Sequence, residues 1–153
     1  MTKISHEVAQ FLVRQGCVIV STKDNKGYPH SACKGIVEID DSGKIYLLDL
    51  YKKNTFANLK KDARVSITAV DEHKFQGYCI KGKAQIILRD KINPVLMKAW
   101  EDRITSRLTQ RVSKNLHEEK GHPRHPEALM PRPEYLIAVD VHDIINLTPQ
   151  HIK

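Results

Sequence analysis

Residues 17–40 read CVIVSTKDNKGYPHSACKGIVEID, and this stretch decides the fold class. On both sides of DNKG the residues follow a period of two and are rich in β-branched types, a pattern typical of β-strands. Asn25 and Gly27 are residue types that adopt the backbone conformations of a hairpin turn. The stretch therefore predicts two antiparallel strands joined by a tight turn.

Further strands are expected along the rest of the chain. KIYLLDL (44–50) follows the turn sequence DDSG, and EYLIAVDVHDIINLT (134–148) supplies the last strand. Between them, ARVSITAV (63–70) and YCIKGKAQIIL (78–88) are separated by DEHKFQG. Strands that recur with turn signals between them predict a closed or nearly closed antiparallel barrel of six strands.

Two longer helices are expected beside the strands. The first spans residues 4–15 and ends at Gly16, and the second spans 94–116 and begins at Asn93 and Pro94. Each has one apolar face, formed by Ile4, Val8, Phe11 and Leu12 in the first helix and by Leu96, Trp100, Ile104, Leu108 and Val112 in the second. We expect Leu96 and Trp100 to pack against the barrel.

Length and composition indicate one soluble domain covering residues 1–153. With 41% hydrophobic and 28% charged residues, the chain has no apolar run near the roughly 20 residues of a membrane span. The N-terminus lacks an apolar signal region, which favours a cytoplasmic location. The formal charge of +7 favours anionic partners such as phosphates.

Three widely spaced cysteines, Cys17, Cys33 and Cys79, all lie in strand-like segments. Their number and spacing indicate neither a disulfide framework nor a CxxC redox site. We interpret them as buried thiols.

Residues 51–67, YKKNTFANLKKDARVSI, combine a lysine pair with a short helix over 57–63. Phe56, just before this helix, and Leu59 within it are expected to point inward. Asn54 or Thr55 suits the helix N-cap, and a helix N-terminus offers N–H groups and a positive dipole to an anion. With Lys52 and Lys53 beside it, this segment suits a phosphate. The alternative is a solvated loop.

The order and separation of four segments resemble the FMN-binding split-barrel family, which includes the pyridoxamine 5'-phosphate oxidases. These segments are GYPHSACKG, KIYLLDL, KKNTFANLKKDARVSI and YCIKGKAQI, within residues 17–87. The resemblance implies a mainly β fold, a six-stranded antiparallel split β-barrel with flanking α-helices. It also implies a homodimer with FMN sites at the subunit interface.

The resemblance assigns cofactor-binding positions residue by residue. The flavin phosphate maps onto Lys53, Asn54 and Thr55, with Lys52 beside them. The second strand, which runs past the isoalloxazine ring, contributes Ala32, Cys33 and Lys34. The ends of the third and fifth strands, which line the ribityl chain and the ring, contribute Leu48, Asp49 and Gln76. No catalytic residue is assigned.

The implied activity is an FMN-dependent oxidoreductase that transfers hydride or electrons between a reduced donor and an unidentified small molecule. The vitamin oxidase itself is disfavoured. It carries Ser-Arg-Lys where this chain has Lys53-Asn54-Thr55 and an arginine-containing C-terminal motif where this chain ends INLTPQHIK. The competing class is a non-catalytic flavin- or haem-binding protein or electron carrier on the same barrel. FAD and deazaflavin are the other cofactor alternatives.

Two features between the fifth and sixth strands each allow more than one functional interpretation. His117, His122 and His125 could hold a metal or haem, but two prolines and irregular spacing favour a polar loop covering the cofactor or the dimer edge, with no metal site. The basic face of Arg107, Arg111 and Lys114 is interpreted as a solvated helix face. It could also guide an anionic substrate or a deazaflavin tail. Because no aromatic stacking platform accompanies it, nucleic-acid binding is not expected.

Overall fold

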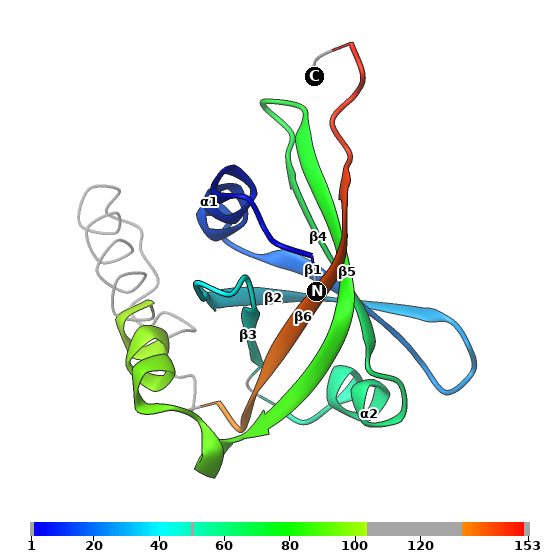
Figure 1. Cartoon of the computed structure of the whole chain (residues 1–153). Helices are drawn as coiled ribbons and strands as arrows, with labels where there is room; N and C mark the ends of the chain where they lie inside the picture. The colour runs from blue at the N-terminus through cyan, green and yellow to red at the C-terminus, as the bar shows by residue number, and fades with distance from the viewer. Residues whose placement is uncertain (1, 50, 104–132, 152–153) are drawn as a thin grey trace, which may run out of the picture.

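The computed structural model of the chain describes residues 2–49, 51–103 and 133–151. Within these residues, six antiparallel strands close into a barrel in the order β1-β2-β3-β6-β5-β4 (Figure 1). The strands are β1 Val18–Lys23, β2 Pro29–Ile39, β3 Ile45–Asp49, β4 Arg64–Asp71, β5 Gln76–Leu88 and β6 Tyr135–Asn146. The helices are α1 His6–Arg14, α2 Asn54–Lys61, the 3-10 turn η1 Arg89–Lys91 and a helix over residues 94–103. The expected mainly β fold, a six-stranded antiparallel barrel with flanking helices, is confirmed.

The first two hairpins share one turn design, in which an aspartate precedes a glycine by three residues. Asp24 accepts hydrogen bonds from the backbone N–H groups of Lys26 and Tyr28, both at 2.9 Å, and Gly27 has a φ of +88°. Asp40 and Gly43 repeat this arrangement in the β2–β3 turn. The hairpin itself was predicted, but the assignment of Asn25 to a special turn conformation is wrong, because the glycine alone takes positive φ and the aspartate side chain organises the loop.

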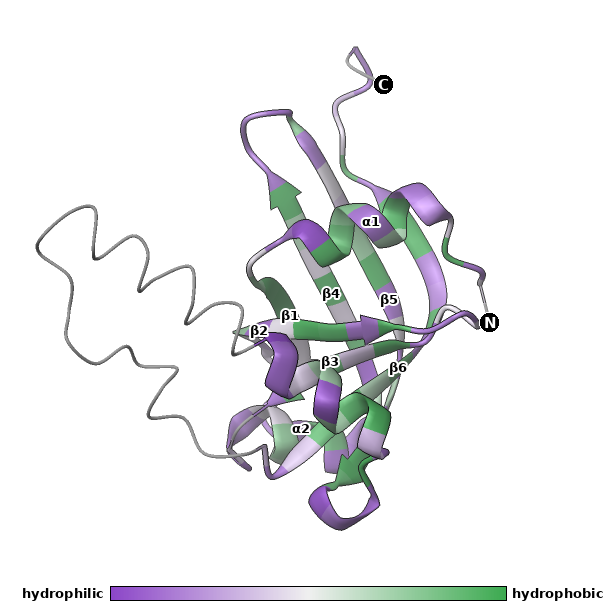
Figure 2. Cartoon of the chain, turned by 90° about the vertical axis from the view of Figure 1, so that its left-hand side faces the viewer, coloured by the Kyte–Doolittle hydropathy of each residue, from purple (hydrophilic) through white to green (hydrophobic). Residues whose placement is uncertain are grey.

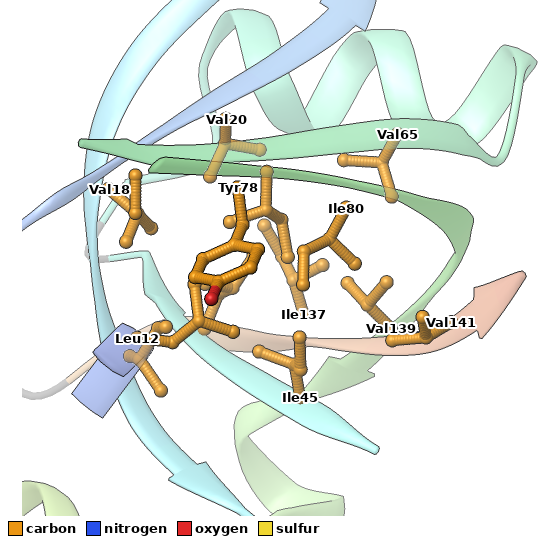
Figure 3. Packing of buried hydrophobic residues seen from close by; sticks show 14 of the residues in the cluster. Leu12, Val18, Val20, Ile45, Val65, Tyr78, Ile80, Ile137, Val139 and Val141 are labelled. Carbon is orange, nitrogen blue, oxygen red and sulfur yellow. The ribbon is translucent and has the colours of Figure 1, made fainter. Parts of the chain in front are cut away.

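Strand alternation builds the barrel core. Figure 2 shows hydrophobic and hydrophilic residues alternating along the strands, and Figure 3 shows the inward side chains meeting at the centre. α1 covers part of this core with Val8, Phe11 and Leu12, and the ring of Phe11 meets that of Tyr78 edge to face at 5.1 Å. Its start at Ser5, which accepts a hydrogen bond from the Val8 N–H, and its end before Gly16 confirm the first expected helix.

A second apolar cluster lies on the outer side of β6. Leu136 points outward there and packs with Ile92 and Leu96, so the first half of β6 is buried on both faces. Leu96 and Trp100 are both buried, which confirms that they pack rather than face solvent. The expected continuation of this helix to residue 116 lies outside the described residues.

α2 begins earlier and ends earlier than the sequence predicts. It spans Asn54–Lys61 rather than 57–63, and Leu59 is buried as expected. Asn58 fixes the helix to the barrel, because its amide donates a 3.0 Å hydrogen bond to the hydroxyl of Thr22 on β1, and both residues are buried. This bond positions the N-terminus of α2 against the β1–β2 hairpin.

The prediction of buried cysteines is wrong for two of the three. Cys17 and Cys33 are exposed and Cys79 is half-buried. Val18, Val20 and Ile36 take the inward positions of β1 and β2, so alternation turns both exposed cysteines to the outer face.

In the described part of the chain, no helix is both long and apolar enough to cross a membrane.

Candidate functional site

A buried polar group lies at one end of the barrel, where β2, β3 and β6 run side by side. Lys34 Nζ lies 2.9 Å from Asp49 Oδ2, and the two side chains are only 9% and 12% exposed. The hydroxyl of Tyr135 donates a hydrogen bond to the same oxygen. Asp49 is therefore shared by a cation and a neutral donor.

The sheet register explains why residues so distant in the sequence meet. β3 pairs on one side with β2, where Gly35 opposes Leu48, and on the other with β6, where Asp49 opposes Tyr135. Burial, with help from the adjacent Asp49 carboxylate, raises the pKa of Tyr135 far above its usual value. Tyr135 is therefore a protonated hydrogen-bond donor at neutral pH.

α2 covers this buried group through an aromatic contact. The ring of Phe56 meets the ring of Tyr135 edge to face, with centroids 4.9 Å apart. The ammonium groups of Lys52 and Lys60 lie 5.4 and 5.2 Å from the Phe56 centroid, within the range of cation–π attraction. Phe56 thus links the buried polar group to the basic surface of α2.

The N-terminus of α2 has no side-chain cap. Lys53 is the N-cap residue, no side chain hydrogen-bonds to the first turn, and the first turn contains no acidic residue. The expectation that Asn54 or Thr55 caps the helix is wrong, because both lie inside it: Asn54 is exposed and Thr55 is buried at 4% exposure. First-turn N–H groups without a side-chain cap are the groups that an anion can accept from.

A cleft of about 390 Å³ separates α2 from the β1–β2 turn. Its lining contains Asn54 and three basic or titratable side chains, Lys26, His30 and Lys61. The one acid in the lining, Asp24, is occupied by the turn N–H groups described above. The cleft therefore combines positive charge with the exposed amide of Asn54.

A larger cleft of about 520 Å³ lies on the other side of the β1–β2 hairpin, against β4 and β5. It contains Lys23, Arg64, Lys81 and Lys83, but none of the residues expected to bind a cofactor. Arg64 is already paired with Asp62, whose pKa is lowered by this arginine. Of the residues expected to bind a cofactor, the smaller cleft includes Asn54, the first residue of α2.

The structure gathers some of the expected site residues and separates others. Lys34 and Asp49 form the buried pair, and Ala32 lies on the same face of β2, half-buried. Cys33 faces outward, and Leu48 packs in the outer cluster below the helix of residues 94–103. Gln76 lies at the far end of the β4–β5 hairpin, where it opposes Asp71, so within one chain it is remote from α2 (Figure 1).

Tyr135 was missed as a functional candidate. Alternation placed it inward with Ile137, but nothing near it in sequence indicated that its hydroxyl would meet Asp49 across the β3–β6 register. The residues His117, His122 and His125, and the basic face of Arg107, Arg111 and Lys114, lie outside the described residues. Within residues 2–49, 51–103 and 133–151, no three histidine, cysteine or acidic side chains gather as a metal site would require.

The family model described as pyridoxamine 5'-phosphate oxidase matches residues 4–131. The chain belongs to the pyridoxamine 5'-phosphate oxidase family. Comparison with curated protein sequences gives no match.

Solved structures share the fold across nearly the whole chain. HupZ of Group A Streptococcus aligns with a TM-score of 0.65 and 20% identity, covering 95% of this chain and 94% of that one. An F420 reductase aligns with a TM-score of 0.56 and 12% identity, covering 93% and 98%. A Clostridium acetobutylicum protein related to general stress protein 26 aligns with a TM-score of 0.55 and 18% identity, covering 96% and 95%. At these identities the similarity concerns the fold.

Proposed function

We propose that this protein is a cytoplasmic, homodimeric FMN-dependent oxidoreductase acting on a small molecule. Membership of the pyridoxamine 5'-phosphate oxidase family supports this class of cofactor. The observation that carries the proposal is the start of α2, where Lys52 and Lys53 stand exposed before a helix without a side-chain cap. This is where the flavin phosphate is expected.

The donors at the start of α2 fit a phosphate ester. Lys53 supplies an ammonium group, which lies 5.5 Å from the centroid of the Tyr51 ring. Asn54 supplies amide N–H donors, and the first turn supplies backbone N–H groups. Lysines bind phosphate as point charges, without the bidentate geometry of arginine, so we expect moderate rather than very tight affinity. Thr55 is buried, and its role is to seat the first turn against the barrel.

FMN, when bound, supplies the redox chemistry, and the chain supplies binding and electrostatics. Lys34 is neutralised by Asp49, so the free positive charge at the site comes from α2. The Lys34–Asp49–Tyr135 group joins the middle of β2 to the end of β3 and the start of β6, and the Tyr135 hydroxyl keeps its proton. None of the three is assigned as a general acid or base.

A dimer explains why several expected residues stand apart within one chain. Cys33 faces outward on β2 and Gln76 lies at the far end of a hairpin, positions from which they can serve a site shared between two chains. Ile19 and Val70 are exposed on the outer faces of β1 and β4, and they offer apolar area to a partner. Light scattering coupled to gel filtration tests this: two chains per particle are expected, and a monomer would contradict it.

FMN titration tests the phosphate site. We expect Lys53→Ala to weaken FMN binding by about tenfold, since a charge-assisted phosphate contact contributes roughly 1–3 kcal/mol. Lys74→Ala is the matched control, because this exposed lysine in the β4–β5 turn carries the same charge away from α2. Equal affinities in the two variants would contradict the assigned phosphate position.

The same protein preparation tests two alternatives, a non-catalytic flavin protein and a protein that binds deazaflavin. If reduced bound flavin is reoxidised by an added organic acceptor no faster than by air, the protein is a non-catalytic flavin store or carrier. Because one structural neighbour is an F420 reductase, deazaflavin is the second cofactor to titrate beside FMN.

A further inference from the structure

Two cysteine sulfurs meet on the outer face of the barrel. The thiol of Cys17 donates a weak hydrogen bond to the sulfur of Cys33, with the two Sγ atoms 3.7 Å apart. Both side chains are exposed. Neither residue lies in the assigned phosphate cleft.

The strand register shows how the sulfurs come together. Ile19 opposes Cys33 and Val18 opposes Lys34, so continuing the register by one residue places Cys17 opposite Gly35. Cys17 and Cys33 are thus diagonal neighbours on the same face of the β1–β2 pair. Gly35 has no side chain, and the guanidinium of Arg103 lies over this position.

The chain near Cys17 can supply the movement that a disulfide requires. The two sulfurs must approach by about 1.7 Å to reach a bond length of about 2.0 Å. Cys17 precedes β1 and is outside its ladder. It follows Gly16, around which a Cβ would meet nothing within 4 Å. Closure therefore requires movement at Cys17, which lies just before β1.

A positive charge stands beside the pair. The guanidinium of Arg103 lies over Gly35, where a Cβ would be 3.8 Å from its Nε, and it donates a hydrogen bond to the Ile36 carbonyl.

We propose that Cys17 and Cys33 form a dithiol site that closes reversibly to an intrachain disulfide by exchange with a low-molecular-weight disulfide such as glutathione disulfide. One cysteine thiolate attacks a sulfur of glutathione disulfide, forming a mixed disulfide and releasing one glutathione thiolate. The second cysteine thiolate then attacks the protein sulfur of the mixed disulfide and releases the second glutathione. The protein loses two protons and two electrons, and both are taken up as two molecules of reduced glutathione.

Cys33 is also one of the positions that the family resemblance assigns to the cofactor, so the test uses flavin-free protein. The reduced full-length protein is incubated with glutathione disulfide, its remaining thiols are alkylated, and the intact mass and cysteine-linked peptides are measured. We expect a product without disulfides between chains, in which each chain has lost two hydrogen atoms, has one alkylated thiol at Cys79 and is restored fully by dithiothreitol. Cys79→Ser is the matched control, and it should form the same bond.

The single variants Cys17→Ser and Cys33→Ser distinguish formation of the intrachain disulfide from reaction of one thiol with glutathione disulfide. Each should stop at a stable mixed disulfide on the remaining cysteine of the pair, with a mass gain of one glutathione. Wild-type protein that accumulates this mixed disulfide instead of closing would overturn the proposal. So would unreactive thiols, or a disulfide between two chains on a non-reducing gel.

Discussion

The ammonium group of Lys34 lies 2.9 Å from a carboxylate oxygen of Asp49, inside a barrel end where both side chains are almost fully buried. The two residues come from neighbouring strands, and both were expected near the flavin. Their pairing means that Lys34 contributes structure, while the charge available to a phosphate comes from Lys52 and Lys53.

Breaking this pair should destabilise the fold. Asp49→Asn leaves Lys34 as a buried charge without a counter-ion, and we expect the free energy of unfolding to fall by about 3 kcal/mol. The triple variant Lys34→Met, Asp49→Leu and Tyr135→Phe replaces all three polar partners by apolar groups and should recover most of that loss. Urea unfolding measures both. A loss below about 1 kcal/mol in Asp49→Asn would show that the pair is solvated.

Because of Tyr135, the free energy of unfolding should decrease as the pH rises above 10. Its folded-state pKa is raised above the ordinary value of 10.0, so the stabilisation is fully present below pH 10 and declines as the pH rises further, by up to about 1.4 kcal/mol per pH unit. Tyr135→Phe should flatten this decline in unfolding experiments above pH 10. Tyr28→Phe, at a position 68% exposed, should leave the decline unchanged. Identical slopes in both variants would contradict a buried, protonated Tyr135.

The strands were predictable because their signal is local. Period-two alternation places Val18 and Val20 inside and Cys17 and Ile19 outside, and this pattern locates each strand to within a few residues. Residue type alone predicts buried cysteines, whereas alternation turns Cys17 and Cys33 to the outer face. α2 was placed too late because Asn54 and Thr55 are good caps in isolation, whereas burial of Thr55 draws the first turn onto the barrel.

The hydrogen bond between Asn58 and Thr22 should determine how firmly α2 is seated. Asn58→Ala removes the amide that donates to the buried Thr22 hydroxyl, and we expect a loss of about 1–3 kcal/mol in the free energy of unfolding. Asn25→Ala, in the exposed β1–β2 turn, is the control and should change stability by less than about 0.5 kcal/mol. Equal effects would mean that α2 is held by its apolar contacts alone.

Gly82 marks a close approach of the β5 backbone to the bulge in β6, where the register skips His142. A Cβ at this position would overlap the carbonyl oxygen of Asp140, so Gly82→Ala should cost about 2 kcal/mol or more. Gly16→Ala is the matched control, since nothing lies within 4 Å of its Cβ position, and it should change stability by less than about 1 kcal/mol. Thermal unfolding compares the two variants, and a neutral Gly82→Ala would contradict the close contact between β5 and β6.

The candidate site was less accessible to prediction than the fold, because its contacts join distant strands. Lys34 and Asp49 were selected by family resemblance, but their ion pair follows from the β2–β3 register, and the hydrogen bond from Tyr135 follows from the β3–β6 register. Gln76 shows the converse. The family resemblance assigns it to the cofactor site, while the length of β4 separates it from α2 in the single chain.

The visible absorption spectrum of the freshly purified protein, followed by FMN titration if it is colourless, tests the central claim most directly. We predict flavin bands, or saturable uptake of one FMN per chain. A Soret band would assign the protein to haem and direct attention to His117, His122 and His125. Failure to take up FMN at saturating concentrations would contradict the proposal that the start of α2 holds a flavin phosphate.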